Sequence, residues 1–133
     1  MKTIFLTLIL TLVFGGALAA QAQTGQKVSV RVNKQAKASR SKLTIKFVSL
    51  VEDSRCAEGT QCVWAGNAKI KVKVTTARGE SKTFEMNTNL GAKGDSIGGY
   101  NIMLESLTPH PNANIRIDRN GYTATFSITK LTR

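Results

Sequence analysis

Apolar and polar residues alternate with a period of two along much of this chain, and this alternation limits the fold more than any other feature. Successive side chains of a strand point to opposite faces of a sheet, so the period marks strands with one buried face. No window of eleven or more residues shows sustained helical spacing. The alternating runs are "KVSVRV" (27–32), "KLTIKFVSL" (42–50), "AKIKVKV" (68–74), "KTFEM" (82–86) and "YNIMLESL" (100–107).

Turn-forming segments separate these runs and indicate the fold class. "ANIRI" (113–117) and "YTATFSI" (122–128) predict a hairpin around an Asn120-Gly121 turn. In the run "KLTIKFVSL" (42–50), the alternation shifts phase near Val48. The Gly-rich stretch "NTNLGAKGDSIGG" predicts a loop. Several short strands joined by turns predict an all-β chain that folds as a single antiparallel β-sandwich, immunoglobulin-like or similar. An open barrel is the competing architecture.

The amino-terminal segment "MKTIFLTLILTLVFGGALAAQAQ" has the composition of a secretory signal peptide. One cation, Lys2, precedes an apolar run from Ile4 to Phe14, and small residues follow, which is the order that such peptides share. The apolar run is shorter than the ~20 residues that a membrane-spanning helix needs. We expect residues 1–22 to be removed, with Ala19 or Ala20 as alternative cleavage sites. The mature chain, residues 23–133, is then a single β-rich domain without a transmembrane anchor, located in the periplasm or outside the cell.

The segment "RCAEGTQCVWAGN" (55–67) contains the only two cysteines and the only tryptophan of the chain. A zinc site needs about four ligands, and the chain offers one histidine besides these cysteines. A redox site prefers Cys-x-x-Cys at the start of a helix, and the spacing here is wider. An exported chain with one pair of cysteines normally oxidises them. We therefore predict a structural disulfide between Cys56 and Cys62, and no metal or cofactor.

Trp64 in this segment and Asp53, which lies two positions before it, also have predicted roles. Trp64 is either an exposed platform for stacking a sugar ring or a core residue that covers the disulfide. We favour the core position, because a buried tryptophan removes a large apolar area from water. Asp53 is expected to cap the disulfide loop through hydrogen bonds to the backbone.

The stretch "EDSRCAEGTQCVWAGNAKIKVKV" resembles a recurring pattern in small exported bacterial proteins. The shared elements are Asp-Ser-Arg-Cys, a short loop, Cys-Val-Trp-Ala-Gly and an alternating strand. Those proteins usually carry proline directly after the first cysteine, where this chain has Ala57. "YNIMLESLTPHP" is also similar, so the resemblance spans residues 43–111. It implies export and a β-rich fold, and it supplies no catalytic residue.

No enzyme motif is present in the sequence. A hydrolytic triad needs a base, and the only histidine, His110, lies in "TPHP", which is typical of a turn. The acidic residues are scattered, and their spacing does not indicate a glycosidase pair. "NLGAKGDSIGG" lacks the Gly-Lys-Ser/Thr ending of a phosphate-binding loop. We therefore predict a protein without catalytic activity, and a small hydrolase is the third hypothesis.

Basic residues dominate the charge of the mature chain, which carries 18 cations against 8 acids. Such an excess attracts anions. Seven cations and no acid lie between Lys27 and Lys46, and Lys69, Lys71 and Lys73 share one face of a strand. The alternative role is a solvated face that prevents edge-to-edge aggregation. The candidate anion-binding residues are Lys69, Lys71, Lys73, Arg31, Lys34, Lys37 and Arg40.

Together these features predict an exported binding or accessory domain. Its partner is an anionic polysaccharide, lipopolysaccharide or another exported protein. Nucleic acid is the weakest candidate, because base stacking needs exposed aromatic side chains and aromatics make up only 6% of the chain. The alternative function is inhibition of a secreted enzyme, with the Cys56–Cys62 loop as a rigid wedge.

Overall fold

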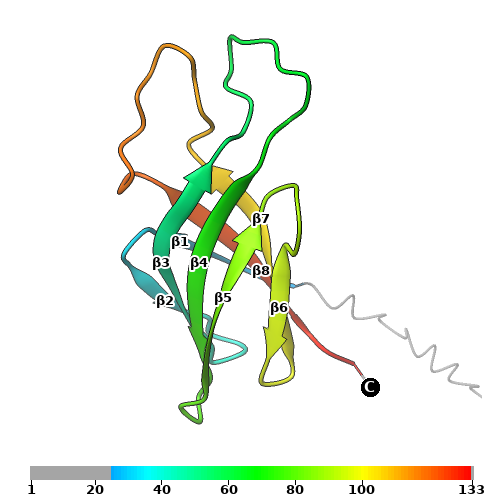
Figure 1. Cartoon of the computed structure of the whole chain (residues 1–133). Coiled ribbons are helices and arrows are strands. Elements are labelled where there is room, and N and C mark those ends of the chain that lie inside the picture. Colours follow the sequence, from blue (N-terminus) through cyan, green and yellow to red (C-terminus); the bar gives the residue numbers. More distant parts are fainter. Residues whose placement is uncertain (1–24, 133) are drawn as a thin grey trace, which may run out of the picture.

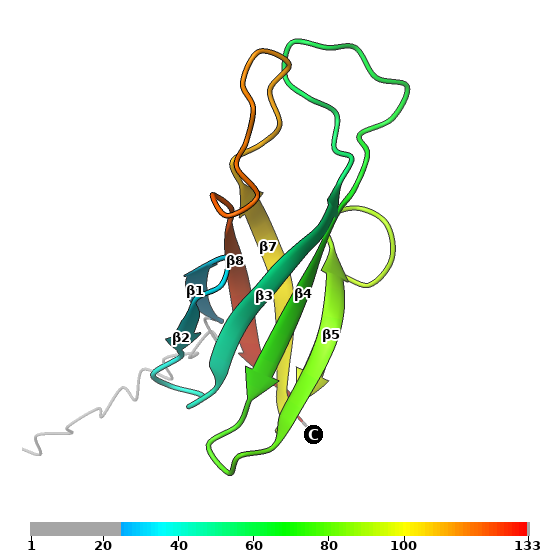
Figure 2. The ribbon, with the colours of Figure 1, turned by 60° about the vertical axis from the view of Figure 1, so that its left-hand side comes forward.

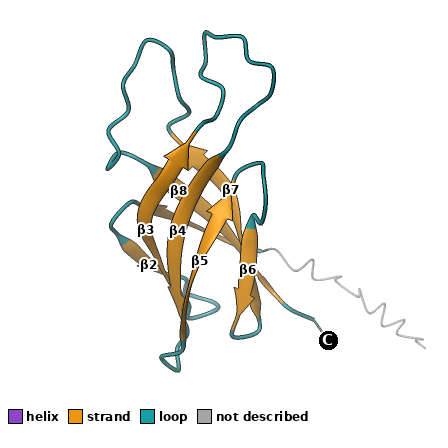
Figure 3. Ribbon diagram, viewed as in Figure 1, coloured by secondary structure: helices purple, strands orange, loops and turns teal. Residues whose placement is uncertain are grey.

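The computed structural model describes residues 25–132, which form two antiparallel four-stranded sheets and no helix (Figures 1 and 3). The first sheet, sheet A, has the strand order β1 (Gln26–Arg31), β8 (Thr123–Lys130), β7 (Tyr100–Thr108), β6 (Gly94–Ile97). The second, sheet B, has the order β2 (Gln35–Lys37), β3 (Thr44–Asp53), β4 (Ala68–Thr75), β5 (Ser81–Asn87). The sheets do not close on each other. The predicted all-β sandwich is therefore confirmed over the open barrel, whereas the predicted signal peptide lies outside the described residues.

The alternating runs form the core between the two sheets. In β4, Ile70, Val72 and Val74 are fully buried, and the lysines between them point to the outer face of sheet B. The strand register places Ile45 of β3 opposite Val74 and Phe47 opposite Val72. Sheet A contributes two large, fully buried side chains to this core, Ile102 and Phe126. Sheet B adds Met86 from β5, and Leu43 lies directly before β3.

The phase shift predicted near Val48 is a β-bulge in β3. The register moves from Phe47 opposite Val72 to Ser49 opposite Lys71, so Val48 is the additional residue. A second irregularity follows between Leu50 and Glu52. As a result, Asp53 lies opposite the buried Ala68 at the end of the strand, and its carboxylate faces the end of the core.

Two sequence predictions of strands were wrong. Residues 113–117 are not a strand: Ile115 makes only an isolated bridge and is 65% exposed, because β8 already pairs with β1 and β7. A turn does form, one residue earlier than the predicted Asn120-Gly121 turn: the Gly121 N–H donates to the Asp118 carbonyl at 2.8 Å, so Arg119 and Asn120 are its central residues. The segment predicted as a Gly-rich loop contains β6, and β2 was also missed. Both strands have four residues or fewer, which is too short for a visible period of two.

Two long loops, residues 54–67 and 109–122, project side by side from one end of the sandwich (Figures 1 and 2). We call this pair of loops the crown. The loop between β5 and β6, residues 88–93, lies at the same end. The crown contains the disulfide segment with Trp64, and also His110, whereas the candidate anion-binding residues lie outside it.

Candidate functional site

The predicted disulfide is confirmed at the start of the crown. Cys56 and Cys62 are bridged, with 5.9 Å between their Cα atoms, and no described cysteine is free. The short loop that they close is also held by the Thr60 N–H, which donates to the Ala57 carbonyl at 3.2 Å. The bridge therefore restrains one end of the segment that continues to Trp64.

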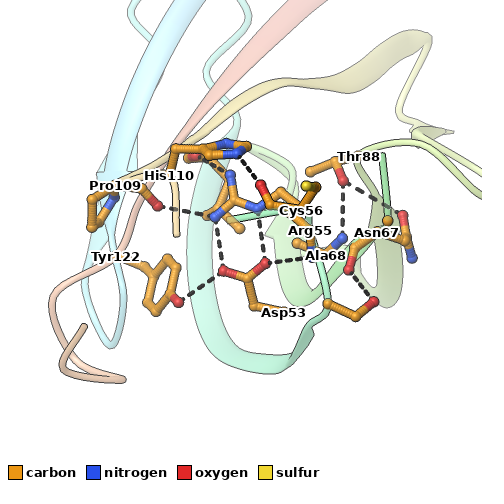
Figure 4. Close-up of polar contacts among 12 residues, drawn as sticks. Asp53, Arg55, Cys56, Asn67, Ala68, Thr88, Pro109, His110 and Tyr122 are labelled. Carbon is orange, nitrogen blue, oxygen red and sulfur yellow. Dashed lines mark hydrogen bonds and ion pairs between the residues drawn. The ribbon is translucent and has the colours of Figure 1, made fainter. Parts of the chain in front are cut away.

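A buried ion pair supports the crown from below. The Arg55 Nε–H and Nη2–H donate to the two carboxylate oxygens of Asp53, both at 2.8 Å, and Tyr122 donates its hydroxyl proton to Asp53 Oδ2 at 2.8 Å (Figure 4). The side chains of Arg55 and Asp53 are only 6% and 7% exposed. We call these three residues the crown anchor. The expected backbone cap is present as well, because Asp53 Oδ1 accepts the Arg55 N–H at 3.3 Å.

Arg55 also fixes the second loop of the crown. Its Nη1–H donates to the Leu107 carbonyl at 2.7 Å and its Nη2–H to the Pro109 carbonyl at 2.9 Å. His110 Nε2 lies 2.8 Å from the Cys56 carbonyl oxygen (Figure 4). One guanidinium thus joins the end of β3 to the end of β7, and His110 acts as a loop contact.

Backbone hydrogen bonds join the two loops further from the core. The Glu58 N–H donates to the Pro111 carbonyl at 2.8 Å, and the Ala113 N–H donates to the Glu58 carbonyl at 3.0 Å. With the contacts of Arg55 and His110, these bonds make the crown a single ordered body.

The crown anchor perturbs the protonation of two of its members. Burial alone would raise the pKa of Asp53, but the hydrogen bonds from Arg55 and Tyr122 and the charge of Arg55 hold that pKa below its ordinary value. Burial and the hydrogen bond to the Asp53 carboxylate raise the pKa of Tyr122 to about 12. At neutral pH the anchor therefore contains a carboxylate, a guanidinium and a neutral phenol.

Asn67 anchors the other end of the disulfide segment. Its carbonyl accepts the Ser54 N–H at 2.8 Å, and its side-chain oxygen accepts the N–H groups of Asn89 and Leu90, both at 3.0 Å. Gly66 precedes it with a positive φ of 75°, and a Cβ there would collide with the Ser54 carbonyl. The Ala-Gly-Asn sequence thus returns the chain to β4 and binds it to the loop after β5.

Trp64 is not a core residue, which corrects the sequence prediction. Its side chain is 56% exposed, and that of Val63 is completely exposed. The place beneath the crown that a tryptophan was expected to fill is taken by the crown anchor, in which Tyr122 is only 5% exposed. Sequence reasoning missed this because the partner of Asp53 and Arg55 lies about seventy positions away, at Tyr122.

The backbone next to these exposed side chains is unpaired. Across residues 25–132, no hydrogen bond involves the N–H or C=O groups of Gln61, Cys62, Val63 or Trp64. Each of these residues is exposed, so solvent reaches the groups. The tip of the crown therefore presents an apolar pair of side chains beside a short run of free hydrogen-bond donors and acceptors.

Some predicted anion-binding residues share the outer face of sheet B. Lys71 and Lys73 project from β4, and Lys46 on β3 lies directly opposite Lys73. Lys37 on β2 lies opposite Thr44, one pair further along the same face. Among the described residues, no ion pair involves these four lysines, which we call the basic face. Lys69, at the crown end of β4, lies 3.9 Å from Glu85.

The other predicted cations lie elsewhere. Arg31 pairs in register with Thr123 and belongs to sheet A. Lys34 lies in the turn between β1 and β2, where its N–H donates to the Arg31 carbonyl at 3.0 Å. Arg40 lies in the turn between β2 and β3, where its N–H contacts the Gln26 side chain. The segment from Lys27 to Lys46 is therefore divided between two sheets and their turns.

A pocket of about 420 Å³ lies beside the second loop of the crown. Glu58, His110, Arg116 and Asp118 contribute to its lining. Two of these groups are engaged in loop structure, because His110 contacts Cys56 and Asp118 Oδ1 accepts the Asn120 N–H at 2.9 Å. Within the described part of the chain, no group of three or more His, Cys, Asp or Glu residues is placed to hold a metal ion.

Comparison with protein families, with characterised proteins and with solved structures finds no match to this chain. Over residues 25–132, no helix has the length and apolarity required to cross a membrane. The functional argument therefore rests on the crown and the basic face themselves.

Proposed function

We propose that this protein is an exported, non-catalytic binding domain that holds a polyanion on the basic face of sheet B. One observation carries the proposal: Lys46 lies directly opposite Lys73, with Lys37 and Lys71 nearby. None of these four lysines forms an ion pair among the described residues, although Glu85 lies opposite Lys71 in the strand register. Like charges on directly opposed strand residues destabilise a sheet, because their Cβ atoms are only about 4.5–5.5 Å apart. A bound polyanion removes that repulsion.

The dimensions of the face suit a polymer better than a single small anion. Alternate residues of a strand are about 6.5–7 Å apart, so the lysines of β4 form a row rather than one cluster. Charges within ~8 Å of one another act together on a ligand at physiological salt. A chain of regularly spaced anionic groups therefore meets several lysines at once. Export is supported by the disulfide, which forms and persists in oxidising compartments.

Charge-neutral variants test this function on immobilised heparin. Lys46→Gln with Lys71→Gln and Lys73→Gln removes three charges from the basic face and leaves the buried residues of β3 and β4 in place. The matched control removes three exposed charges elsewhere, with Arg78→Gln, Lys93→Gln and Lys130→Gln. We expect the first variant to elute at clearly lower salt than the control. Equal elution of both variants would mean that the basic face is only a solvated surface.

The crown supports a second candidate function, inhibition of a secreted enzyme. Val63 and Trp64 project from a segment restrained by a disulfide, and a rigid binding element loses little conformational entropy when it is bound. Different residues carry the two functions, because the basic face lies on the strands of sheet B and the inhibitory element lies at the tip of the crown. Variants of one surface therefore leave the other unchanged. Loss of inhibition in Val63→Ala with Trp64→Ala, but not in the basic-face variant, would favour the inhibitor.

A further inference from the structure

We propose that the tip of the crown is a sugar-binding subsite, so that the polyanion is an acidic polysaccharide. In this subsite the ring of Trp64 stacks on a sugar, and the unpaired backbone of residues 61–64 hydrogen-bonds to its hydroxyl groups. The inference rests on the proposed function of the basic face and specifies the ligand class.

Trp64 and Val63 are the residues of the disulfide segment that folding contacts do not explain. Asp53 and Arg55 belong to the crown anchor, the cysteines are bridged, and Asn67 ties the segment to the loop after β5. By contrast, Trp64 is more than half exposed and Val63 wholly exposed. A tryptophan held in water on an ordered loop exposes apolar area that folding leaves unburied, and this points to an external partner.

The chemistry around Trp64 favours a sugar. A sugar ring offers an apolar face of C–H groups to the indole and hydroxyl groups at its rim, and hydroxyls both donate and accept hydrogen bonds. This matches the free N–H and C=O groups of residues 61–64. A lipid phase fits poorly, because unpaired backbone groups are costly to bury among acyl chains. A phosphate oxygen accepts hydrogen bonds only, which leaves the free carbonyls unpaired.

The subsite and the basic face are within reach of one polymer. Lys69, at the crown end of β4, lies five positions after Trp64, and an extended chain of that length spans at most about 17–18 Å. Lys69 to Lys73 adds about 13 Å along the strand. Gly66 and Asn67 fix the path between the two surfaces, because both are bonded to the loop after β5. An oligosaccharide of several residues is long enough to contact both.

Because Trp64 is the only tryptophan, its fluorescence reports on this subsite alone. We would titrate the protein with an oligomer of galacturonic acid and with linear polyphosphate of equal charge. The galacturonate oligomer is expected to shift or quench the emission, whereas polyphosphate is expected to bind without doing so. Affinity for both would be measured independently by calorimetry.

The variant Trp64→Ala separates the two claims. Its affinity for the galacturonate oligomer is expected to fall by about 5- to 150-fold, the range that alanine substitution of an aromatic side chain produces for a stacked nucleobase, and its affinity for polyphosphate by less than twofold. The matched control is Leu90→Ala, a second exposed apolar residue at the same end of the sandwich, which should leave both affinities unchanged.

Each alternative outcome has a distinct meaning. If both probes bind the wild type but Trp64→Ala weakens neither, the sugar subsite is overturned and the basic face stands. If neither probe binds, the proposed function fails, and the subsite fails with it. If vesicles containing phosphatidylglycerol shift the fluorescence and the galacturonate oligomer does not, the tip contacts membranes and the subsite is overturned.

Discussion

Arg55 illustrates how one side chain determines the local structure of a whole end of the molecule. Its guanidinium donates to a carboxylate at the end of β3, to the last part of β7 and to Pro109 in the following loop. A planar guanidinium can make all these bonds from one position, which a lysine cannot do. The residues of the sequence "DSRC" therefore anchor the crown to the ends of β3 and β7.

Single residues were also the least predictable part of the chain. The burial of Trp64 was predicted wrongly, because local sequence does not show that Tyr122 and the ion pair already fill the end of the core. The disulfide was predictable, because only two cysteines were available in a chain with features of export. Predicting the exposure of Trp64 required knowledge of contacts between distant residues, whereas predicting the disulfide did not.

The raised pKa of Tyr122 predicts a loss of stability at alkaline pH. The pKa is about 12 in the folded state and 10.0 ordinarily, so between these values the unfolded chain loses this proton before the folded chain does. The contribution of Tyr122 to the free energy of unfolding should therefore be fully present below pH 10. It should fall as the pH rises towards 12, by at most about 1.4 kcal/mol per pH unit. The measurement is urea unfolding of the wild type and of Tyr122→Phe.

The Phe variant isolates the contribution of this hydroxyl group, because the two proteins differ at residue 122 alone. The difference in unfolding free energy between wild type and variant should shrink from pH 10 to pH 12. A constant difference would contradict the assignment. At acid pH the sign is reversed: the lowered pKa of Asp53 contributes stability above its ordinary pKa of 3.8, and this contribution is lost as the pH falls through the lowered value.

At the scale of strands and loops, the length of a strand determined whether it could be recognised in the sequence. The long strands β3, β4 and β7 carry enough alternating residues to be recognised, and the bulge in β3 was visible as a phase shift. The short strands β2 and β6 were not recognised. Residues 113–117 alternate as a strand does, yet they lie in a loop, because strand formation also requires a neighbour with free backbone groups.

Removal of the disulfide should loosen the crown without unfolding the sandwich. For Cys56→Ser with Cys62→Ser we expect a loss of about 2–2.5 kcal/mol in unfolding free energy, as loop entropy predicts for so short a loop. The crown anchor remains in this variant, so amide hydrogen exchange should increase mainly within residues 56–65. Equal acceleration throughout the core strands would show that the bridge supports the whole fold.

Across the whole molecule, the two outer faces differ in chemistry. The outer face of sheet B carries Lys37, Lys46, Lys71 and Lys73, whereas that of sheet A combines two cations, Lys27 and Arg31, with hydroxyl groups such as the Ser29 and Thr125 pair at 2.9 Å. The sequence predicted an excess of cations but not their distribution. Without the pairing of strands, the run from Lys27 to Lys46 looked like one patch, and the fold places its members on two sheets.

Export predicts the mass of the protein recovered outside the cytoplasm. Cleavage after Ala22 leaves a chain that begins at Gln23, and oxidation makes it two hydrogens lighter than its reduced form. Intact mass spectrometry before and after reduction under denaturing conditions measures both. Recovery of the complete 133-residue chain, or of a chain with two free thiols, from its own host would contradict this prediction.

The position of the crown anchor beneath the loops has a consequence for how such a protein diversifies. The ion pair that holds the crown lies at its base, and the backbone bonds between the two loops involve Glu58 and Ala113. By contrast, Gln61, Val63 and Trp64 are exposed and make no hydrogen bond within residues 25–132. We therefore expect substitutions at the tip to change what the proposed subsite binds, with little effect on folding. A library randomised at Gln61, Val63 and Trp64 should yield mostly folded members, and the scaffold is then suited to selection for new ligands.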